Sequence, residues 1–160
     1  MIVVLMGVSG AGKTTTGEAL ASALGWPFRD ADNLHPAANV DKMRAGIPLT
    51  DDDRWPWLDR VIDEMRRVEE TDGHVVFACS ALKQSYRDYL ARAGDVRFVY
   101  LAGDCDTIAQ RLAARKHEYM PATLLASQFA TLEPPTDALV IDVRRGVDEQ
   151  VAAIRAGLGA

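Results

Sequence analysis

The sequence predicts an α/β protein in which a parallel β-sheet carries helices on both faces. Short apolar runs alternate along the chain with amphipathic segments of helical length, which is the pattern of a βαβ fold. The first apolar run leads straight into a glycine-rich loop and then a helical segment. Hydrophobic residues make up 48% and charged residues 26% of the 160 positions, so we expect residues 1–160 to form a single globular domain.

Five short segments are expected to form the strands of this sheet. Ile2–Met6 is a continuous apolar run, as expected of a central parallel strand that is covered on both faces. Each of the other expected strands is separated from the next by at least one helical segment. In chain order they are Phe28–Asp30, Val75–Cys79, Val96–Leu101 and Leu139–Asp142.

The segments between the strands have the apolar spacing of helices. Lys13–Leu24 is followed by Gly25, and glycine commonly ends a helix. The next helix is expected to begin with Pro36, because proline is favoured in a first turn. The predicted helices after the first are Pro36–Ala45, Trp55–Glu70, Gln84–Ala93, Thr107–Arg115, Ala122–Thr131 and Val147–Leu158.

Charge and cysteine content exclude several classes of protein. A formal net charge of −5 argues against a nucleic-acid partner, which requires a basic surface. Cys79 and Cys105 do not make a disulfide scaffold or a zinc site, so a reducing cytoplasm is the expected location. The apolar start runs into the glycine loop and is expected to be a buried strand rather than a signal peptide. No apolar run is long enough to span a membrane.

The glycine-rich loop has the pattern G-x-x-x-x-G-K-[ST] at every fixed position. Its glycines allow backbone N–H groups to curl around phosphate oxygens, and the following helix N-terminus adds partial positive charge. Lys13 is expected to reach the β- and γ-phosphates of ATP, and Thr14 to place its hydroxyl on Mg²⁺. A turn that binds nothing is the alternative, against which the strand and helix in register argue. The expected ATP-binding residues of this P-loop are Gly7, Ser9, Gly10, Ala11, Gly12, Lys13, Thr14 and Thr15.

Two carboxylates follow the second expected strand, where ligands bind in open α/β sheets. Asp30 and Asp32 are two residues apart, and on an extended segment their side chains would point to the same side. One could support Mg²⁺ through water while the other accepts the proton of a substrate hydroxyl. An Asp/Asn-rich turn is the alternative. The third strand ends in Cys79 and Ser80 rather than an acid, which favours Asp30 or Asp32 as the metal carboxylate.

Basic residues lie near the ends of other strands. Arg54 follows three aspartates and could clamp a substrate carboxylate or form an ordinary ion pair, while the aspartates suit a helix N-terminus. Lys83 and Arg87 are spaced i, i+4 and share a helix face, either at the site or in solvent. His35 follows Asp32 closely, so a substrate contact competes with a purely structural role.

A second basic pair lies further along the chain. Arg111 and Arg115 are also spaced i, i+4, just before the polar stretch Lys116–Pro121. An arginine here could stack on adenine or close over the transferring phosphate. The alternative is that both are surface arginines on a helix.

Together the motifs resemble the bacterial-type gluconokinases, small kinases of the shikimate-kinase-like branch of P-loop proteins. The phosphate loop is shared with many nucleotide-binding proteins, whereas the later blocks are far more specific. The resembling segments span nearly the whole chain: GVSGAGKTT (Gly7–Thr15), DADNLHPAANVDKM (Asp30–Met43), GIPLTDDDRWPWL (Gly46–Leu58), CSALKQSYRDYL (Cys79–Leu90) and LLASQFATLEPP (Leu124–Pro135).

The resemblance implies ATP-dependent phosphorylation of D-gluconate at its 6-hydroxyl. It further implies a five-stranded sheet of order 2-3-1-4-5, a mobile lid over about residues 116–121, and often a homodimer. Asp32 falls where the family meets the substrate hydroxyl, and we assign Asp30 to Mg²⁺ through water. The same resemblance implies that Arg54, Lys83, Arg87 and Gln128 hold the substrate and that Arg111 and Arg115 contact ATP.

The chain departs from the family at one place. The lid often has Gly-His-Phe after the basic pair, whereas this sequence has His117-Glu118-Tyr119. Tyr119 is aromatic like the phenylalanine that the family often has, but a role for a lid histidine is in doubt. The competing functions are a kinase for shikimate or a nucleoside monophosphate, against which the later blocks argue, and a non-catalytic nucleotide-binding module, from which loss of Lys13 or Thr14 would be expected.

Overall fold

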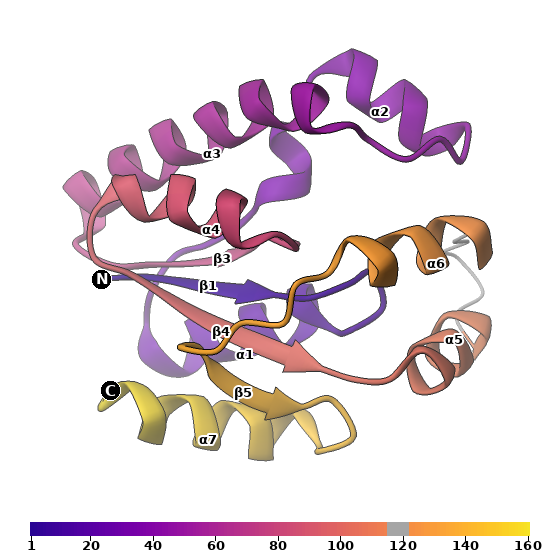
Figure 1. Ribbon diagram of the computed structural model, residues 1–160. Coiled ribbons are helices and arrows are strands. Elements are labelled where there is room, and N and C mark those ends of the chain that lie inside the picture. The colour runs from indigo at the N-terminus through magenta and orange to yellow at the C-terminus, as the bar shows by residue number, and fades with distance from the viewer. Residues whose placement is uncertain (115–121) are drawn as a thin grey trace.

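A computed structural model describes residues 1–114 and 122–160. It contains a sheet of five parallel strands in the order β2-β3-β1-β4-β5 (Figure 1). This confirms the predicted fold class and the order that the family resemblance implied. The strands are β1 (Ile2–Met6), β2 (Phe28–Asp30), β3 (Val75–Ala78), β4 (Val96–Ala102) and β5 (Leu139–Asp142).

The central strand β1 is buried along its whole length. It pairs with β3 on one side and β4 on the other, so that Val4 is opposite both Phe77 and Phe98. Because β1 has strands on both edges and helices on both faces, every one of its side chains faces protein. This explains why its sequence is an unbroken apolar run rather than an alternating one.

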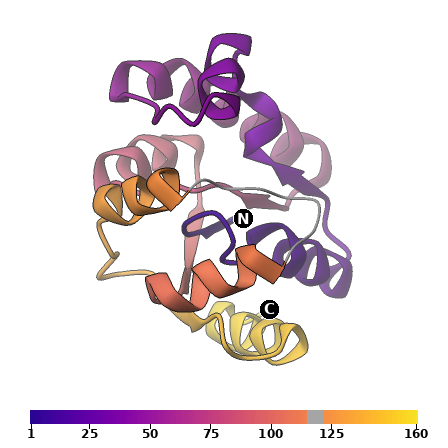
Figure 2. The same cartoon turned by 90° about the vertical axis from the view of Figure 1, so that its right-hand side faces the viewer.

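Helices cover both faces of the sheet (Figure 1). On one face lie α3 (Asp51–Asp72), α4 (Gln84–Leu90) and the short η2 (Ala91–Ala93), and on the other lie α1 (Lys13–Leu24) and α7 (Val147–Leu158). The remaining elements gather at the carboxyl ends of the strands (Figure 2). They are η1 (Ala31–Leu34), α2 (Ala37–Arg44), α5 (Cys105–Ala114) and α6 (Ala122–Thr131).

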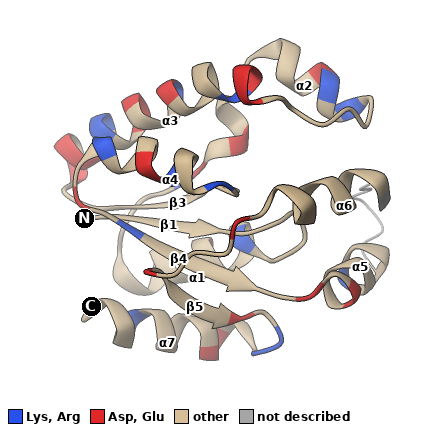
Figure 3. Cartoon of the chain, viewed as in Figure 1, with Lys and Arg blue, Asp and Glu red and all other residues tan. Residues whose placement is uncertain are grey.

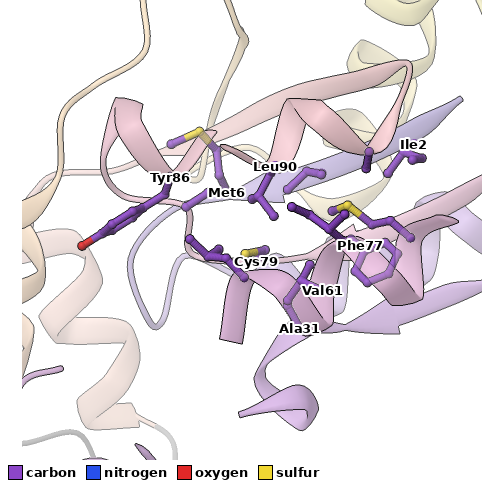
Figure 4. Packing of buried hydrophobic residues seen from close by; sticks show 14 of the residues in the cluster. Ile2, Met6, Ala31, Val61, Phe77, Cys79, Tyr86 and Leu90 are labelled. Atoms are coloured by element: carbon purple, nitrogen blue, oxygen red, sulfur yellow. The ribbon is translucent and has the colours of Figure 1, made fainter. Parts of the chain in front are cut away.

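The sheet separates two hydrophobic cores. The core beneath α3 and α4 contains Trp57, Phe77 and Tyr86, and Tyr86 lies at its edge with the hydroxyl pointing out of the cluster (Figure 4). The core beneath α1 and α7 contains Leu20 and Ile154. Burial of these side chains on both faces holds the strand ends, and hence the loops after them, in fixed relative positions.

Helix α3 begins four residues before the predicted start at Trp55, because its first turn is capped. The Thr50 hydroxyl accepts the backbone N–H of Asp53 at 3.2 Å, and the Asp53 carboxylate accepts the N–H of Thr50 at 2.9 Å. This capping box uses two of the otherwise unpaired N–H groups of the helix start. The acidic run is therefore a helix N-terminus, as its sequence suggested.

The segment after β2 is a turn, which was the alternative to the expected extended stretch carrying Asp30 and Asp32. Ala31–Leu34 forms a 3₁₀ turn. The cause is local, because the Asp30 carboxylate accepts the backbone N–H of Asp32 at 3.0 Å and caps the turn. The indole N–H of Trp57 donates to the carbonyl of Ala31 at 2.8 Å and ties the turn to α3.

Acidic and basic side chains are interspersed along α3 and α4 on the side of the molecule shown in Figure 3. Among residues 1–114 and 122–160, no helix combines the length and apolarity that a bilayer crossing requires.

Candidate active site

The loop between β1 and α1 has the backbone shape of a phosphate cradle. Gly10 has a φ of +85°, and a Cβ there would lie 2.8 Å from the Cγ of Leu112 on α5, so only glycine fits. Gly12, with a φ of +92°, precedes α1 without a capping side chain, and the first turn of α1 contains no acid. The N–H groups at this helix start are therefore not taken by a cap, as an anion-binding helix N-terminus requires.

Lys13 lies across this loop. Its Nζ donates to the carbonyl of Gly7 at 2.9 Å and to that of Val8 at 3.0 Å. The ammonium is thus held beside the backbone that is expected to surround the phosphates. Lys13 also lines the cavity described below, so its charge acts on both parts of the site.

Thr14 and Asp30 lie together at the start of α1. The Thr14 hydroxyl donates to Asp30 Oδ2 at 2.9 Å. Mg²⁺ commonly binds one or two protein oxygens while keeping waters and substrate phosphates as its other ligands, and this pair fits that requirement. Within the described part of the chain no cluster of three or more His, Cys, Asp or Glu side chains could hold a metal. The end of β3 supplies only Cys79, where burial raises the pKa of the thiol to about 12.

A cavity of about 270 Å³ opens beside the phosphate loop. Its walls come from the loop, η1, α2 and the segment after it, α3, the turn after β3, and α6, all of which meet at the carboxyl ends of the strands (Figure 2). One part of the wall is polar and another is apolar. The lining residues are Ser9, Lys13, Asp32, His35, Met43, Ile47, Pro48, Leu49, Arg54, Trp57, Ser80, Leu82, Leu124, Ser127 and Gln128.

Asp32 presents its carboxylate to this cavity. The side chain keeps 67% of its surface accessible, and partial desolvation by the protein around it raises the pKa of its carboxyl. The charge of Lys13 opposes the shift and that of Asp30 adds to it. A raised pKa makes this carboxylate a better proton acceptor than an ordinary aspartate.

His35 is packed behind Asp32. Its ring stacks on Trp57 at a centroid distance of 4.2 Å and an interplanar angle of 15°, and only 3% of the side chain is exposed. Burial, with a smaller contribution from the nearby charge of Arg54, lowers the pKa of His35 to about 4, and the charge of Asp30 opposes this shift. His35 is therefore neutral at physiological pH, and its approach to Asp32 is not an ion pair.

Arg54 brings a positive charge to the cavity wall. Its Nη1 donates to the hydroxyl of Tyr86 at 2.9 Å, and the guanidinium lies 5.3 Å from the Tyr86 ring centre. The Tyr86 hydroxyl in turn donates to Asp51. The contacts with Tyr86 hold the guanidinium in place at the cavity wall, so that Arg54 could bind an anionic group inside the cavity.

Lys83 and Arg87 do not line the cavity. Lys83 Nζ is paired with Asp51 at 2.9 Å, and this contact raises the pKa of Lys83. Arg87 is 3% exposed, and its guanidinium donates to the carbonyl of Ala81 at 2.7 Å and to that of Glu133 at 2.7 Å. Ala81 has a φ of +45°, so Arg87 braces a strained turn beside the cavity.

Gln128 joins α6 to the phosphate loop. Its Oε1 accepts the backbone N–H of Ser9 at 2.7 Å, and its Nε2 donates to the Ser9 hydroxyl at 3.2 Å. Gln128 also lines the cavity, where the family resemblance placed it. Gln128 therefore contacts the phosphate loop and also faces the cavity.

The nucleotide-side arginines are only partly described. Arg111, near the end of α5, donates to the carbonyl of Val143 after β5, away from the cavity. Arg115, His117-Glu118-Tyr119 and the expected lid over 116–121 lie outside the described residues.

Sequence reasoning overlooked several members of the site. Asn39 and Tyr86 are buried polar groups that hold His35 and Arg54. The sequence spacing could have indicated that these residues lie near the site. Asn39 lies four residues after His35, and Tyr86 lies three residues after Lys83. Trp57 belongs to the core beneath α3 and also forms part of the cavity wall.

Comparison with known proteins agrees with this geometry. The family model described as shikimate kinase matches residues 9–131. A gluconokinase from Gluconobacter oxydans strain 621H is 50% identical over 136 residues, covering 84% of this chain and 76% of the relative. The thermoresistant gluconokinase of Escherichia coli K12 is 43% identical over 157 residues, covering 95% and 90%. The crystal structure of a gluconokinase from Sinorhizobium meliloti 1021 superposes with a TM-score of 0.89 at 44% identity, covering 98% and 90%.

The fold and the site thus define a P-loop kinase of the shikimate kinase class. The identity to curated gluconokinases extends over most of both chains, well beyond the shared phosphate loop. Within that class, the chain belongs to the gluconokinase family.

Proposed function

We propose that this protein transfers the γ-phosphate of ATP to the 6-hydroxyl of D-gluconate, giving 6-phospho-D-gluconate and ADP for sugar-acid catabolism. The observation that carries the proposal is the cavity of about 270 Å³ that has Lys13, Asp32 and Arg54 in its wall. A phosphate-binding lysine, a proton acceptor and an anion-binding arginine around one space suit a hydroxylated acid as phosphate acceptor. The names of the similar proteins support gluconate as that acid.

On the phosphate side, the loop N–H groups and Lys13 bind the β- and γ-phosphates. The Lys13 charge stabilises negative charge as it shifts toward the leaving oxygen of ADP. Thr14 would hold Mg²⁺ directly and Asp30 through water, the ion when bound would neutralise the phosphate oxygens, and the 2.9 Å contact between these side chains supports this assignment. Arg111 and Arg115 remain proposed contacts to ATP, from the family resemblance.

On the acceptor side, Asp32 orients the 6-hydroxyl and accepts its proton. The hydroxyl oxygen forms the new bond to the γ-phosphorus while the bond from that phosphorus to the ADP oxygen breaks. The raised pKa of the Asp32 carboxyl supports this assignment of the base. Arg54 binds the substrate carboxylate and Gln128 contacts a hydroxyl group, while His35, expected from the sequence as a possible substrate contact, lies behind Asp32 instead.

Lys83 and Arg87 take part in a different way from that expected. Lys83 orders Asp51, which accepts from Tyr86 behind Arg54, and Arg87 holds the turn that carries Ser80. We propose that both support the substrate pocket indirectly. A homodimer is proposed from the resemblance alone, and a cytoplasmic location agrees with the free thiols of Cys79 and Cys105.

An ADP-release assay with ATP and Mg²⁺ tests the function. The acceptors compared are gluconate, glucose, shikimate and nucleoside monophosphates. Gluconate should give by far the highest kcat/KM, because glucose lacks the carboxylate that Arg54 would bind. Equal specificity for glucose and gluconate would exclude the carboxylate contact, and preferred turnover of shikimate or a nucleotide would replace gluconate as the substrate.

A further inference from the structure

Asn39 is a buried polar residue directly behind the cavity wall. It belongs to α2, is 3% exposed, and does not line the cavity itself. Its side-chain Nδ2 lies 2.9 Å from the backbone carbonyl oxygen of Asp53 and 3.2 Å from Nδ1 of His35. The same nitrogen therefore serves both neighbours.

The carbonyl of Asp53 decides which way the Asn39 amide faces. A carbonyl oxygen can only accept, so the atom 2.9 Å from it must be the amide nitrogen rather than the amide oxygen. One N–H of that nitrogen is used by Asp53, and the other is directed at His35 Nδ1. Because an amide N–H can only donate, Nδ1 must accept and carries no proton.

The ring proton of a neutral His35 is consequently on Nε2. This nitrogen lies 3.8 Å from Oδ1 of Asp32, slightly beyond hydrogen-bonding distance. The ring plane is held by its stack on Trp57, which is itself anchored to Ala31, the residue before Asp32. A second ring proton on Nδ1 would face the amide N–H, in agreement with the pKa of His35 lying near 4.

We propose that Asn39 is a positioning residue that fixes His35 as the Nε2–H tautomer, so that a neutral donor orients the Asp32 carboxylate. A small side-chain rotation brings Asp32 Oδ1 onto this donor, and the other oxygen stays available for the substrate proton. The consequence for turnover rests on the proposed function, whereas the tautomer does not depend on it.

The tautomer is measured directly by ¹⁵N NMR of the histidine rings in the intact, unliganded protein. The chain has three histidines, so His35 is assigned by comparison with a His35→Gln variant. We expect an unprotonated Nδ1 and a protonated Nε2 at pH 7 in the wild type, and a mixture of tautomers in Asn39→Ala. A protonated Nδ1 in the wild type, or an unchanged pure Nε2–H form in Asn39→Ala, would overturn the proposal whatever the substrate is.

Kinetics with gluconate then separate positioning from a general structural effect. Asn39→Ala should lower kcat roughly tenfold with little change in the KM for ATP. His35→Gln, which keeps an N–H near the position of Nε2, should retain more activity than His35→Asn. In the His35→Gln background, Asn39→Ala should have almost no further effect, because glutamine has no tautomer to select.

The matched control is Asn33→Ala, since Asn33 is the other asparagine of the chain and is exposed on η1. It should leave both the NMR signals and kcat unchanged. An equal loss of kcat from Asn39→Ala in the wild-type and His35→Gln backgrounds would show that Asn39 acts only through stability, and would refute the positioning role.

Discussion

The two sides of the candidate site are built in different ways. The phosphate side is one contiguous segment, Gly7–Thr14, and its backbone forms the phosphate cradle. The acceptor side is assembled from side chains on η1, α2, α3 and α6 that come from widely separated positions in the chain. A contiguous loop can be recognised as a motif, whereas the acceptor wall depends on packing contacts. Changes to the first should remove phosphate transfer, and changes to the second should alter substrate binding, proton transfer or stability.

Lys13→Ala should have the largest effect and tests the phosphate side. Removal of the ammonium beside the loop carbonyls should lower kcat by about a thousandfold or more, because it removes charge stabilisation in the transition state. The fold should remain intact, as judged by circular dichroism. ADP release with gluconate is the measurement, and turnover close to wild type would disprove the role of the loop.

Asp32→Asn tests the acceptor side where it meets the phosphate. Asparagine keeps the shape but cannot accept the hydroxyl proton, so kcat should fall by roughly two to four powers of ten. The KM for ATP should change little. Asp30→Asn is the matched variant and should instead weaken the dependence on Mg²⁺. The opposite pattern in the two variants would reverse the roles of these aspartates.

Arg54→Ala should affect substrate binding more than chemistry. Loss of a charge-assisted contact worth about 1.5–3 kcal/mol should raise the KM for gluconate roughly tenfold to a hundredfold. Steady-state kinetics at saturating ATP give the value. Arg66→Ala, an exposed substitution on the same helix, serves as the control and should behave as wild type. An unchanged KM in Arg54→Ala would remove Arg54 from the substrate site.

Arg87→Ala should act on stability rather than on the substrate. It leaves the carbonyls of Ala81, Leu82 and Glu133 without their guanidinium donor in a buried position. The free energy of unfolding should fall by about 2–4 kcal/mol, measured by urea denaturation. If stability is retained and the KM for gluconate rises instead, Arg87 contacts the substrate directly.

The smallest expected effect is a pH dependence of stability from His35. Its pKa is about 4 in the folded protein and near 6.5 when unfolded, so the unfolded chain binds more protons between these values. The contribution of His35 to the free energy of unfolding is fully present above pH 6.5 and is lost as the pH falls toward 4. The loss should be roughly 1–3 kcal/mol larger in the wild type than in His35→Gln. Parallel stability curves for the two proteins would contradict a depressed pKa.

Local patterns predicted the sheet and the phosphate loop well. The structure reproduces α6, β5 and α7 with the predicted bounds, because each is a short segment with clear apolar spacing and end signals. The same reasoning misjudged Arg87. Its i, i+4 spacing with Lys83 predicted a shared helix face, but Lys83 precedes α4 as its N-cap residue, and no sequence pattern shows which backbone carbonyls lack a donor.

The acceptor wall was predicted only in part. Asp32 and Arg54 were identified from charge and position, and both line the cavity. The turn after β2 was one of two alternatives that the sequence left open, and its contact with Trp57, 26 residues beyond Ala31, could not be predicted from local pattern. Asn39 was missed for a similar reason, since its partner carbonyl belongs to Asp53 on a different helix.

The stack of Trp57 on His35 places a natural fluorophore in the cavity wall. Indole emission responds to the polarity and the protonation state of the groups in contact with it. Trp26 stacks in a comparable way on His74, 4.4 Å away, so a Trp26→Phe background would leave one histidine-stacked indole among the described residues. Trp55 also emits in that background, so the change in emission on adding gluconate alone, before any phosphate is transferred, is the signal expected to report on Trp57 and the acceptor side.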